Sequence, residues 1–524
     1  MNQCLGVAEI QSLICENLDR KSAFAMALTA HAFLEPALNE IWRTVDSFRP
    51  LIDCLPDDLW TAKALPSPTK PDKINTILHV AREPQAEDLH RYLTRYASRI
   101  RNFKPAVSAG MKMLSPDALL ALQYATDFQP GALSPQLKHF QWISLKSIAD
   151  GLGDEFVRRL SSYMILFVGK TVDSINLSDA NTSTPLEMAA VRYILKRLPC
   201  LKLLRGLPAN DATPLPESLV TLVRWDRLES AVLAGNPVTV RSLRHLASLP
   251  RLRQLTMMNL GITLPQGLSR AVTGFTSLQD VTYACDRLPR VLEFLQHLPQ
   301  TNIVQSILFM GIKFCTPSQL TEALRYAETY LNPETLFTME IREKAGRPAP
   351  QSLEELIETD QPDPVDLQPL HVFSKLKVLC LKFRGGVRLT SKEIEGIPNT
   401  WPNLRVLILL PTILNSHRFP SIDHIHVSAL LRSLPLLRKL GLQFNTTQIL
   451  SDEPNAEPWV SDLQELSVGA SPISSPSRVI DFIKAHLPRL TTLTIPKKSS
   501  GVGEGTILER RWEAVHQGWK QGQS

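Results

Sequence analysis

A nine-residue pattern of hydrophobic and polar positions recurs along most of the chain. It is clearest in Leu249–Met257, which reads Leu-Pro-x-Leu-x-x-Leu-x-hydrophobic, and it returns at Leu434–Leu442 and Leu487–Ile495. We call the residue at the seventh position of this pattern, a leucine or another hydrophobic residue, the frame residue. It occurs thirteen times at a mean spacing of about 29 residues. The frame residues are Phe140, Ile175, Leu204, Ala231, Leu255, Val281, Ile307, Met339, Leu379, Leu407, Leu440, Leu466 and Leu493.

Each copy of the pattern predicts a helix followed by a short strand. The closing Leu-x-Leu alternates, so both side chains point to one face of a strand. The preceding segments carry hydrophobic residues at i, i+3, i+4 and i+7, as in Leu320, Ala323, Leu324 and Ala327, which is one stripe on a helix. The proline that follows stops the helix where the chain turns towards the strand.

Units of this kind resemble leucine-rich repeats, which have periods of about 20–29 residues. The resemblance covers roughly residues 95–495 and implies an α/β solenoid with parallel strands on one wall and helices on the other. The family's usual Asn or Cys, three residues after the second strand leucine, is found in register only at Asn445. An irregular solenoid of about thirteen repeats over residues 95–497 is therefore the predicted fold. Stacked helical pairs without strands are the alternative, which leaves the Leu-x-Leu after each proline unexplained.

Residues 1–48 lie outside this pattern and predict three short helices. The first carries the hydrophobic stripe Leu5, Ile10, Leu13, Ile14 and Leu18; the second begins at Ser22; the third includes Phe33 to Trp42. Helices this short cannot bury their hydrophobic faces alone, so they need a partner or the repeats.

The same segment resembles the divergent F-box found before leucine-rich repeats in fungal proteins. The matching positions are Leu5, Glu9-Ile10, Leu13-Ile14, Leu18-Asp19, Ala27-Leu28, Ala32-Phe33, Glu35-Pro36-Ala37-Leu38 and Ile41-Trp42. The family usually opens with Leu-Pro, whereas Gly6 follows Leu5 here, and His31-Ala32 stands where Arg or Cys commonly precedes the aromatic residue. The resemblance implies docking on a Skp-type adaptor of a cullin complex through Leu5, Ile10, Leu13, Ile14 and Leu18, with Leu28 and Phe33 internal. A capping domain for the end of the solenoid is the alternative.

Three segments depart from the repeat. Residues 49–94 are proline-rich at first and predict a turn-rich connector followed by a helix that carries Arg91, Arg95 and Arg99 on one side, a solvated face rather than a site for an anionic partner. We interpret the acidic, proline-rich segment 345–372 as an insertion that the solenoid tolerates, with contact to a basic partner as the alternative. Residues 498–524 predict a mobile connector and a capping helix with Leu508, Trp512, Val515 and Trp519 on one face.

Composition narrows the class of protein. The chain has 524 residues, of which 44% are hydrophobic and 21% charged, and we count 81 leucines. A net charge of +6 is too dilute to indicate nucleic-acid binding. The seven cysteines form no Cys-x-x-Cys pair, and the sequence contains no long apolar run. We therefore expect a cytoplasmic or nuclear protein that binds neither nucleic acid nor membrane.

No pattern in the sequence predicts catalysis. His417, His424 and His426 have no accompanying Cys or carboxylate pattern, so we interpret them as exposed residues near a helix start. Gly501–Gly505 lacks the Gly-Lys-Ser/Thr ending of a phosphate loop, and Asp150–Glu155 is too short for a calcium loop. We expect no catalytic residue, metal or cofactor.

The order of the parts predicts the function. An F-box-like module followed by repeats is typical of a substrate-recognition subunit of an SCF-type cullin ubiquitin ligase, with an unidentified protein target bound by the strand-lined face. A leucine-rich repeat scaffold or inhibitor without ligase association is the alternative, and a hydrolytic enzyme ranks third.

Overall fold

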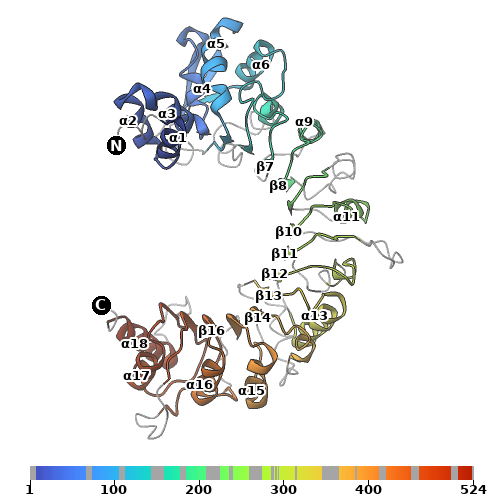
Figure 1. The fold of residues 1–524 in the computed structure, drawn as a ribbon, viewed down its shortest axis with the longest axis vertical. Coiled ribbons are helices and arrows are strands. Elements are labelled where there is room, and N and C mark those ends of the chain that lie inside the picture. Colours follow the sequence, from blue (N-terminus) through green and yellow to red (C-terminus); the bar gives the residue numbers. More distant parts are fainter. Residues whose placement is uncertain are drawn as a thin grey trace. The chain divides into compact units, whose positions relative to one another are not determined.

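The computed structural model divides the chain into two compact units, Met1–Leu252 and Arg253–Ser524. It describes residues 7–66, 74–105, 112–142, 159–177, 185–207, 225–234, 240–258, 274–284, 288, 292, 294–312, 315–344, 365–383, 386–411, 420–449, 459–496 and 506–521. Many of their helices and strands are labelled in Figure 1.

The first unit opens with three helices, as expected: α1 (Ala8–Glu16), α2 (Arg20–Thr29) and α3 (His31–Arg43). Strand β1 (Thr44–Val45) follows α3 directly and pairs in parallel with β4 (Asn102–Phe103). The repeat sheet therefore begins inside the range 1–48 that we assigned to a separate helical module.

The helix predicted at the end of residues 49–94 is α5, whereas the residues before it form regular structure rather than the predicted turn-rich connector. They contain α4 (Arg49–Ile52), η2 (Asp57–Leu59), β2 (Trp60–Pro66), β3 (Ile74–Val80) and α5 (Ala86–Arg95). Strands β2 and β3 pair antiparallel, and β5 (Lys112–Leu114) adds in parallel to β3. The prediction was wrong because the prolines bound these elements: Pro66 ends β2, and Pro84 lies two residues before α5.

Parallel pairing continues through the rest of the first unit in the order β1-β4-β6-β7-β8-β9. The remaining elements are η3 (Ala97–Arg99), α6 (Pro116–Ala125), β6 (His139–Gln141), η4 (Ser161–Leu166), β7 (Ser174–Asn176), α9 (Pro185–Leu195), β8 (Leu203–Leu207), β9 (Ser230–Ala234) and α11 (Val240–Ala247).

In its described residues, the second unit repeats this plan with nine parallel strands in sequence order, β10 to β18. The strands are β10 (Gln254–Met258), β11 (Asp280–Ala284), β12 (Ser306–Ile312), β13 (Thr338–Glu343), β14 (Val378–Phe383), β15 (Val406–Pro411), β16 (Lys439–Gly441), β17 (Glu465–Ser467) and β18 (Thr492–Thr494). Its helices are α13 (Pro317–Tyr330), η5 (Gln368–Leu370), α15 (Ser391–Thr400), α16 (His424–Ser433), α17 (Pro476–His486) and α18 (Ile507–Gln521).

All thirteen frame residues lie on these strands, aligned in register with their neighbours. In the first unit Phe140, Ile175, Leu204 and Ala231 are successive partners. In the second unit the alignment runs without a break from Leu255 to Leu493. Every frame residue is buried, with at most 4% of its surface exposed. The predicted frame is confirmed.

Two further frame positions, Val45 and Phe103, were not predicted from the sequence. Val45 pairs with Phe103, and Phe103 pairs with the first predicted frame residue, Phe140. Phe103 stacks on Phe140 with ring centroids 5.6 Å apart and on Phe167 at 4.4 Å. Val45 and Phe103 lie on two-residue strands, and neither is a leucine, which is why a search for leucine repeats missed them.

A backbone ladder holds the repeats in register. In most steps, one carbonyl accepts hydrogen bonds from two successive N–H groups of the next repeat. The Lys377 carbonyl, for example, accepts from Arg405 (2.7 Å) and Val406 (3.1 Å), and the Arg405 carbonyl accepts from Arg438 and Lys439. Asn445 does not belong to this ladder; its side chain accepts locally from Thr447. Backbone bonds therefore supply the alignment for which the family's asparagine was expected.

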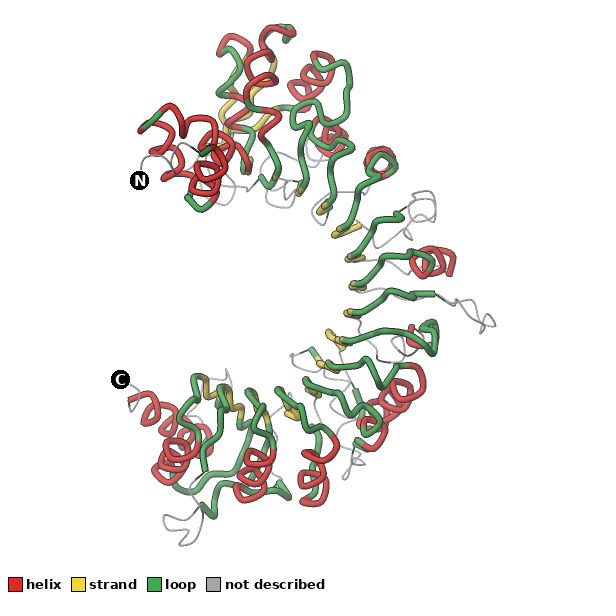
Figure 2. The backbone as a smooth tube through the Cα atoms, in the orientation of Figure 1, coloured by secondary structure: helices red, strands yellow, loops and turns green. Residues whose placement is uncertain are grey.

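The helix ends follow the predicted signals. Thr316 caps α13 in a capping box with Gln319, before Pro317 at the first helical position. Trp401 and Leu434 each precede a proline, and each leaves the helical conformation, with ψ values of 69° and 73°. In the second unit the helices lie on one side of the strands, and in the first unit α6, α9 and α11 do so, whereas α1 to α3 lie at the end of the sheet (Figure 2). This arrangement of parallel strands and outer helices is that of a leucine-rich-repeat-like solenoid within each unit.

The acidic insertion and the tail are described only in part. Residues 345–364 lie outside the described ranges. The end of the insertion packs as η5 against α13, where Leu367 and Leu370 are buried. Residues 497–505 are also outside, whereas α18 packs on α17, with Trp512, Val515 and Trp519 buried and Leu508 half-buried.

Candidate functional site

Helices α1 and α2 pack on α3 through small residues. Ala23 of α2 and Ala37 of α3 are fully buried, and Cys15 is the most buried residue of α1. Asp19 caps α2, since its carboxylate accepts a 2.7 Å hydrogen bond from the backbone N–H of Ser22. Hydrogen bonds from the Ser22 side chain and backbone hold the pKa of Asp19 below its usual value. The turn between α1 and α2 is thereby fixed.

The residues predicted to contact an adaptor occupy different environments. Leu5 lies outside the described residues. Leu13 is 58% exposed, whereas Ile10, Ile14 and Leu18 are half-buried.

Helix α2 adds two exposed hydrophobic residues that the sequence analysis did not assign to a surface. Phe24 is 59% exposed and Leu28 is 74% exposed. The prediction that Leu28 is internal was wrong. Ala23 faces α3, whereas Phe24 and Leu28, one turn apart at i and i+4, are exposed to solvent on another side of the helix. Phe33 of α3, also predicted internal, is half-buried.

Helix α3 fastens the three helices to the first unit. Trp42 stacks on Tyr96 with centroids 4.3 Å apart and meets Tyr92 edge-on at 6.2 Å. Arg99 forms a 2.6 Å ion pair with Glu35 and also hydrogen-bonds Asn39. Arg99, predicted to lie on a solvated face, is instead an internal link of the first unit. Together with the β1–β4 pair, these contacts attach α3 to the rest of the first unit, and α1 and α2 pack on α3.

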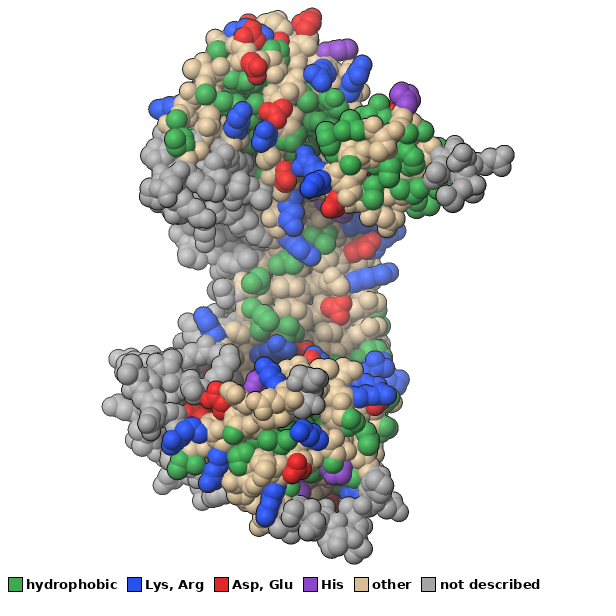
Figure 3. All heavy atoms as spheres, turned by 90° about the vertical axis from the view of Figure 1, so that its left-hand side faces the viewer, with side chains coloured by type: hydrophobic (Ala, Val, Ile, Leu, Met, Phe, Trp, Pro, Cys, Tyr) green, Lys and Arg blue, Asp and Glu red, His purple; other side chains and the backbone are tan. Residues whose placement is uncertain are grey.

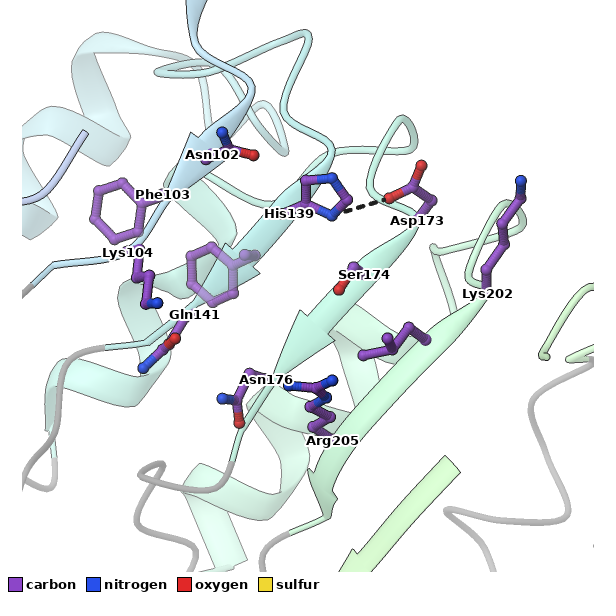
Figure 4. A pocket seen from close by; sticks show the side chains of 12 residues that line it. Asn102, Phe103, Lys104, His139, Gln141, Asp173, Ser174, Asn176, Lys202 and Arg205 are labelled. Atoms are coloured by element: carbon purple, nitrogen blue, oxygen red, sulfur yellow. Dashed lines mark ion pairs between the residues drawn. The ribbon is translucent and has the colours of Figure 1, made fainter. Parts of the chain in front are cut away.

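A second candidate site is a hollow of about 430 Å³ on the strand face of the first unit (Figure 4). It is lined by Asn102, Phe103, Lys104, His139, Phe140, Gln141, Asp173, Ser174, Asn176, Lys202, Leu203 and Arg205. Phe103 and Phe140 are buried and form its floor. The other side chains come from the outward positions of β4, β6, β7 and β8 or from the residues next to these strands.

The hollow carries an excess of positive charge. Its lining has three cations, Lys104, Lys202 and Arg205, and one carboxylate, Asp173. Asp173 Oδ1 lies 3.5 Å from His139 Nδ1, and a dashed line in Figure 4 marks this pair. The three cations are exposed, and none forms an ion pair within the part of the chain that the structure describes. This site could have been predicted from the sequence, because four of its residues each directly follow a frame position: Lys104, Gln141, Asn176 and Arg205.

Hydrophobic and basic side chains share the surface of the first unit. In Figure 3 they are exposed side by side in the upper part of the view, which is this unit. A smaller hollow of about 210 Å³, lined by Phe128, Ser162, Ile165, Ala190, Tyr193 and Ile194, lies beside the exposed aromatic rings of Phe128 and Tyr193.

The segments considered for metal or phosphate binding do not form a site in the described structure. His424 is 4% exposed, so the expectation of an exposed histidine there was wrong. His426 takes part in the cap of α16 with Asp423. His417, Gly501–Gly505 and Asp150–Glu155 lie outside the described ranges. Within those ranges no group of three or more His, Cys, Asp or Glu side chains is placed to hold a metal ion.

The helices that the structure describes include none long and apolar enough to cross a membrane.

The chain matches no protein-family model and no curated protein. Among solved structures, it resembles a chain from the crystal structure of a TLR13–ssRNA13 complex, with 13% sequence identity and a TM-score of 0.32. The match covers 77% of this chain and 59% of the TLR13 chain.

Proposed function

We propose that the chain is the substrate-recognition subunit of an SCF-type cullin ubiquitin ligase. Its N-terminal helices bind a Skp-type adaptor, and its strand face binds a protein target. The chain performs no chemistry itself in this proposal. It raises the effective concentration of the target near the ubiquitin-loading enzyme.

One observation supports the first half of the proposal, that the N-terminal helices bind an adaptor (the adaptor half). Four of the fifteen exposed large hydrophobic side chains of the described structure fall between residues 7 and 28: Val7, Leu13, Phe24 and Leu28. Their exposed fractions are 43%, 58%, 59% and 74%. Such a concentration on two short helices is typical of a surface that a partner covers. The resemblance to an F-box supports a Skp-type adaptor as that partner.

The target half is supported by the strand face. Parallel strands present outward side chains at regular spacing, and repeat proteins bind partners on surfaces of this kind. In the first unit the outward positions are polar and basic around the hollow. In the second unit they include hydrophobic residues, such as Leu308, Val378 and Ile408.

Point variants test the adaptor half better than deletion of residues 1–48, because deletion also removes β1 and the α3 contacts. The Leu13→Glu/Leu28→Glu variant is expected to bind purified Skp-type adaptor at least about tenfold more weakly, since two exposed apolar contacts are lost. Ile425→Glu/Val460→Glu is the matched control, because these residues are 55% and 66% exposed in the second unit. Equal adaptor binding by the two variants would contradict the proposal.

A scaffold or inhibitor without ligase association is the second candidate. The packing of α3 on the first unit through Trp42 and Arg99 favours it, because the helices then also serve as an end cap. This candidate predicts no adaptor binding by the unaltered chain at micromolar concentration, with target binding by the strand face retained.

A further inference from the structure

The cations of the strand-face hollow follow a regular arrangement. Gln141 of β6 is the register partner of Asn176 of β7, which is the partner of Arg205 of β8. Phe103 pairs with Phe140, so Lys104 comes next to Gln141 in the same row. One row across four strands therefore reads Lys-Gln-Asn-Arg, with a cation at each end and two amides between them. Figure 4 shows Asn176 and Arg205 side by side on neighbouring strands.

The row has a length that a peptide can match. Neighbouring strands lie about 4.8 Å apart, so three steps separate Lys104 from Arg205 by about 14 Å. An extended chain advances about 3.3 Å per residue, so residues four apart in a peptide span the same distance. Side-chain amides donate and accept hydrogen bonds, as a peptide backbone requires. Both cations are available to carboxylates, since neither has an ion-pair partner among the described residues.

The arrangement is specific to the first unit. In the second unit the residues that follow the frame residues include no lysine or arginine: they are Thr256, Thr282, Leu308, Glu340, Cys380, Ile408, Gly441, Ser467 and Thr494. Single-stranded nucleic acid fits the hollow less well than a peptide. It binds to exposed aromatic rings on which bases stack, and the two aromatic residues of this lining, Phe103 and Phe140, are 1% and 2% exposed.

We propose that the row Lys104–Gln141–Asn176–Arg205 binds an extended acidic segment of the target protein, with Asp or Glu side chains about four residues apart on Lys104 and Arg205. Gln141 and Asn176 bind the peptide backbone between them, and Lys202 adds positive charge to the same hollow. The inference rests on the proposed target-binding role of the strand face and deepens it by naming the chemistry of the target.

A peptide library tests the assignment without knowledge of the target. The full chain is immobilised and used to select from a random twelve-residue phage-displayed library at low ionic strength. The expected result is enrichment of Asp or Glu at two positions about four residues apart. The Lys104→Glu/Arg205→Glu variant is expected to lose this enrichment by roughly tenfold and to select Lys or Arg instead, because the end charges are reversed.

The matched control is Lys170→Glu/Lys196→Glu, which makes the same charge change at exposed residues outside the hollow. It is expected to keep the acidic preference, and circular dichroism melts of all three proteins verify that they are folded. Equal loss in the control, or no spaced acidic preference in the unaltered chain, would overturn the inference. So would charge-reversal-sensitive binding of a single-stranded oligonucleotide in place of peptides. Adaptor binding, measured separately, distinguishes failure of this inference from failure of the proposed ligase role.

Discussion

At the scale of single residues, some backbone segments of neighbouring repeats approach each other so closely that only glycine fits between them. Gly131 has a φ of +74°, and a Cβ there would lie 2.7 Å from the Cα of Gly169 in the next repeat. Its N–H donates a 2.8 Å hydrogen bond to the Ile165 carbonyl. Backbone atoms cannot move aside as the end of a side chain can, so this contact admits only glycine.

We predict that Gly131→Ala lowers the free energy of unfolding by about 1–3 kcal/mol, because alanine is strained at positive φ and meets backbone. Gly396 is the control. It lies within α15, and a Cβ there meets nothing within 4 Å. Gly396→Ala is expected to stabilise the chain by about 0.5–1 kcal/mol, since glycine is a poor helix residue. Denaturant unfolding curves check both values, and equal effects of the two substitutions would refute the argument.

His297 makes stability depend on pH. The residue is 7% exposed, and neither ring nitrogen finds a hydrogen-bond partner among the residues that the structure describes. Burial lowers the pKa of His297 below its usual value of 6.5. Below pH 6.5 the unfolded chain therefore binds more protons at this residue than the folded chain, and stability falls as the pH falls.

We predict that His297→Leu reduces the loss of stability between pH 7.5 and pH 5.5. The exposed His90, changed to Leu in the same way, is expected to leave that loss as it is. Denaturation midpoints at the two pH values measure the difference. Identical pH dependence in the unaltered chain and in His297→Leu would show that this histidine titrates normally in the folded state.

At the scale of elements, the periodic hydrophobic pattern predicted the strands correctly because the residues that are buried are also the ones that align between neighbouring strands. Leu440 is a frame residue in the sequence, a register partner of Leu407 and Leu466, and 1% exposed. The helix ends were predictable for a similar reason: Thr316 and Pro317 act within one turn of chain.

Other elements depended on contacts that linear spacing does not contain. The hairpin β2–β3 was missed because Pro66 lies at the end of β2 rather than inside the strand. Leu28 was placed inside because its exposure depends on which face of α2 meets α3. The row Lys104–Gln141–Asn176–Arg205 comes from residues that are 37, 35 and 29 positions apart in the sequence, so it becomes visible only when the strands are aligned in register.

The terminal helix α18 covers the last repeat of the second unit. Trp512 is fully buried and donates a 2.8 Å hydrogen bond to the Ser471 carbonyl. Arg511 donates to the Ile473 carbonyl at 2.7 Å. These contacts replace the neighbour that an internal repeat would have.

We predict that Trp512→Ala destabilises the second unit by about 3–5 kcal/mol and promotes aggregation, because a large buried ring is removed from the cap. Gln517→Ala, at an exposed position of the same helix, is expected to have little effect. Thermal melts followed by light scattering compare the two variants. Unchanged melting of Trp512→Ala would mean that α18 is not needed as a cap.

At the scale of the whole molecule, the two units are built from the same kind of repeat, but the residues on the outward positions of their strands differ. The first unit combines the exposed hydrophobic residues of α1 and α2 with the basic row of the hollow. The second unit presents a more apolar strand face and ends in the α18 cap. In our proposal the adaptor and an acidic segment of the target therefore both bind the first unit, on different elements.

Hydrogen–deuterium exchange of the full chain, with and without a purified Skp-type adaptor, tests the central claim most directly. The account predicts slower amide exchange in residues 8–29, where a partner would cover Leu13, Phe24 and Leu28, and unchanged exchange in α15 to α18. Unchanged exchange in residues 8–29 at saturating adaptor, or protection confined to the strands, would contradict it.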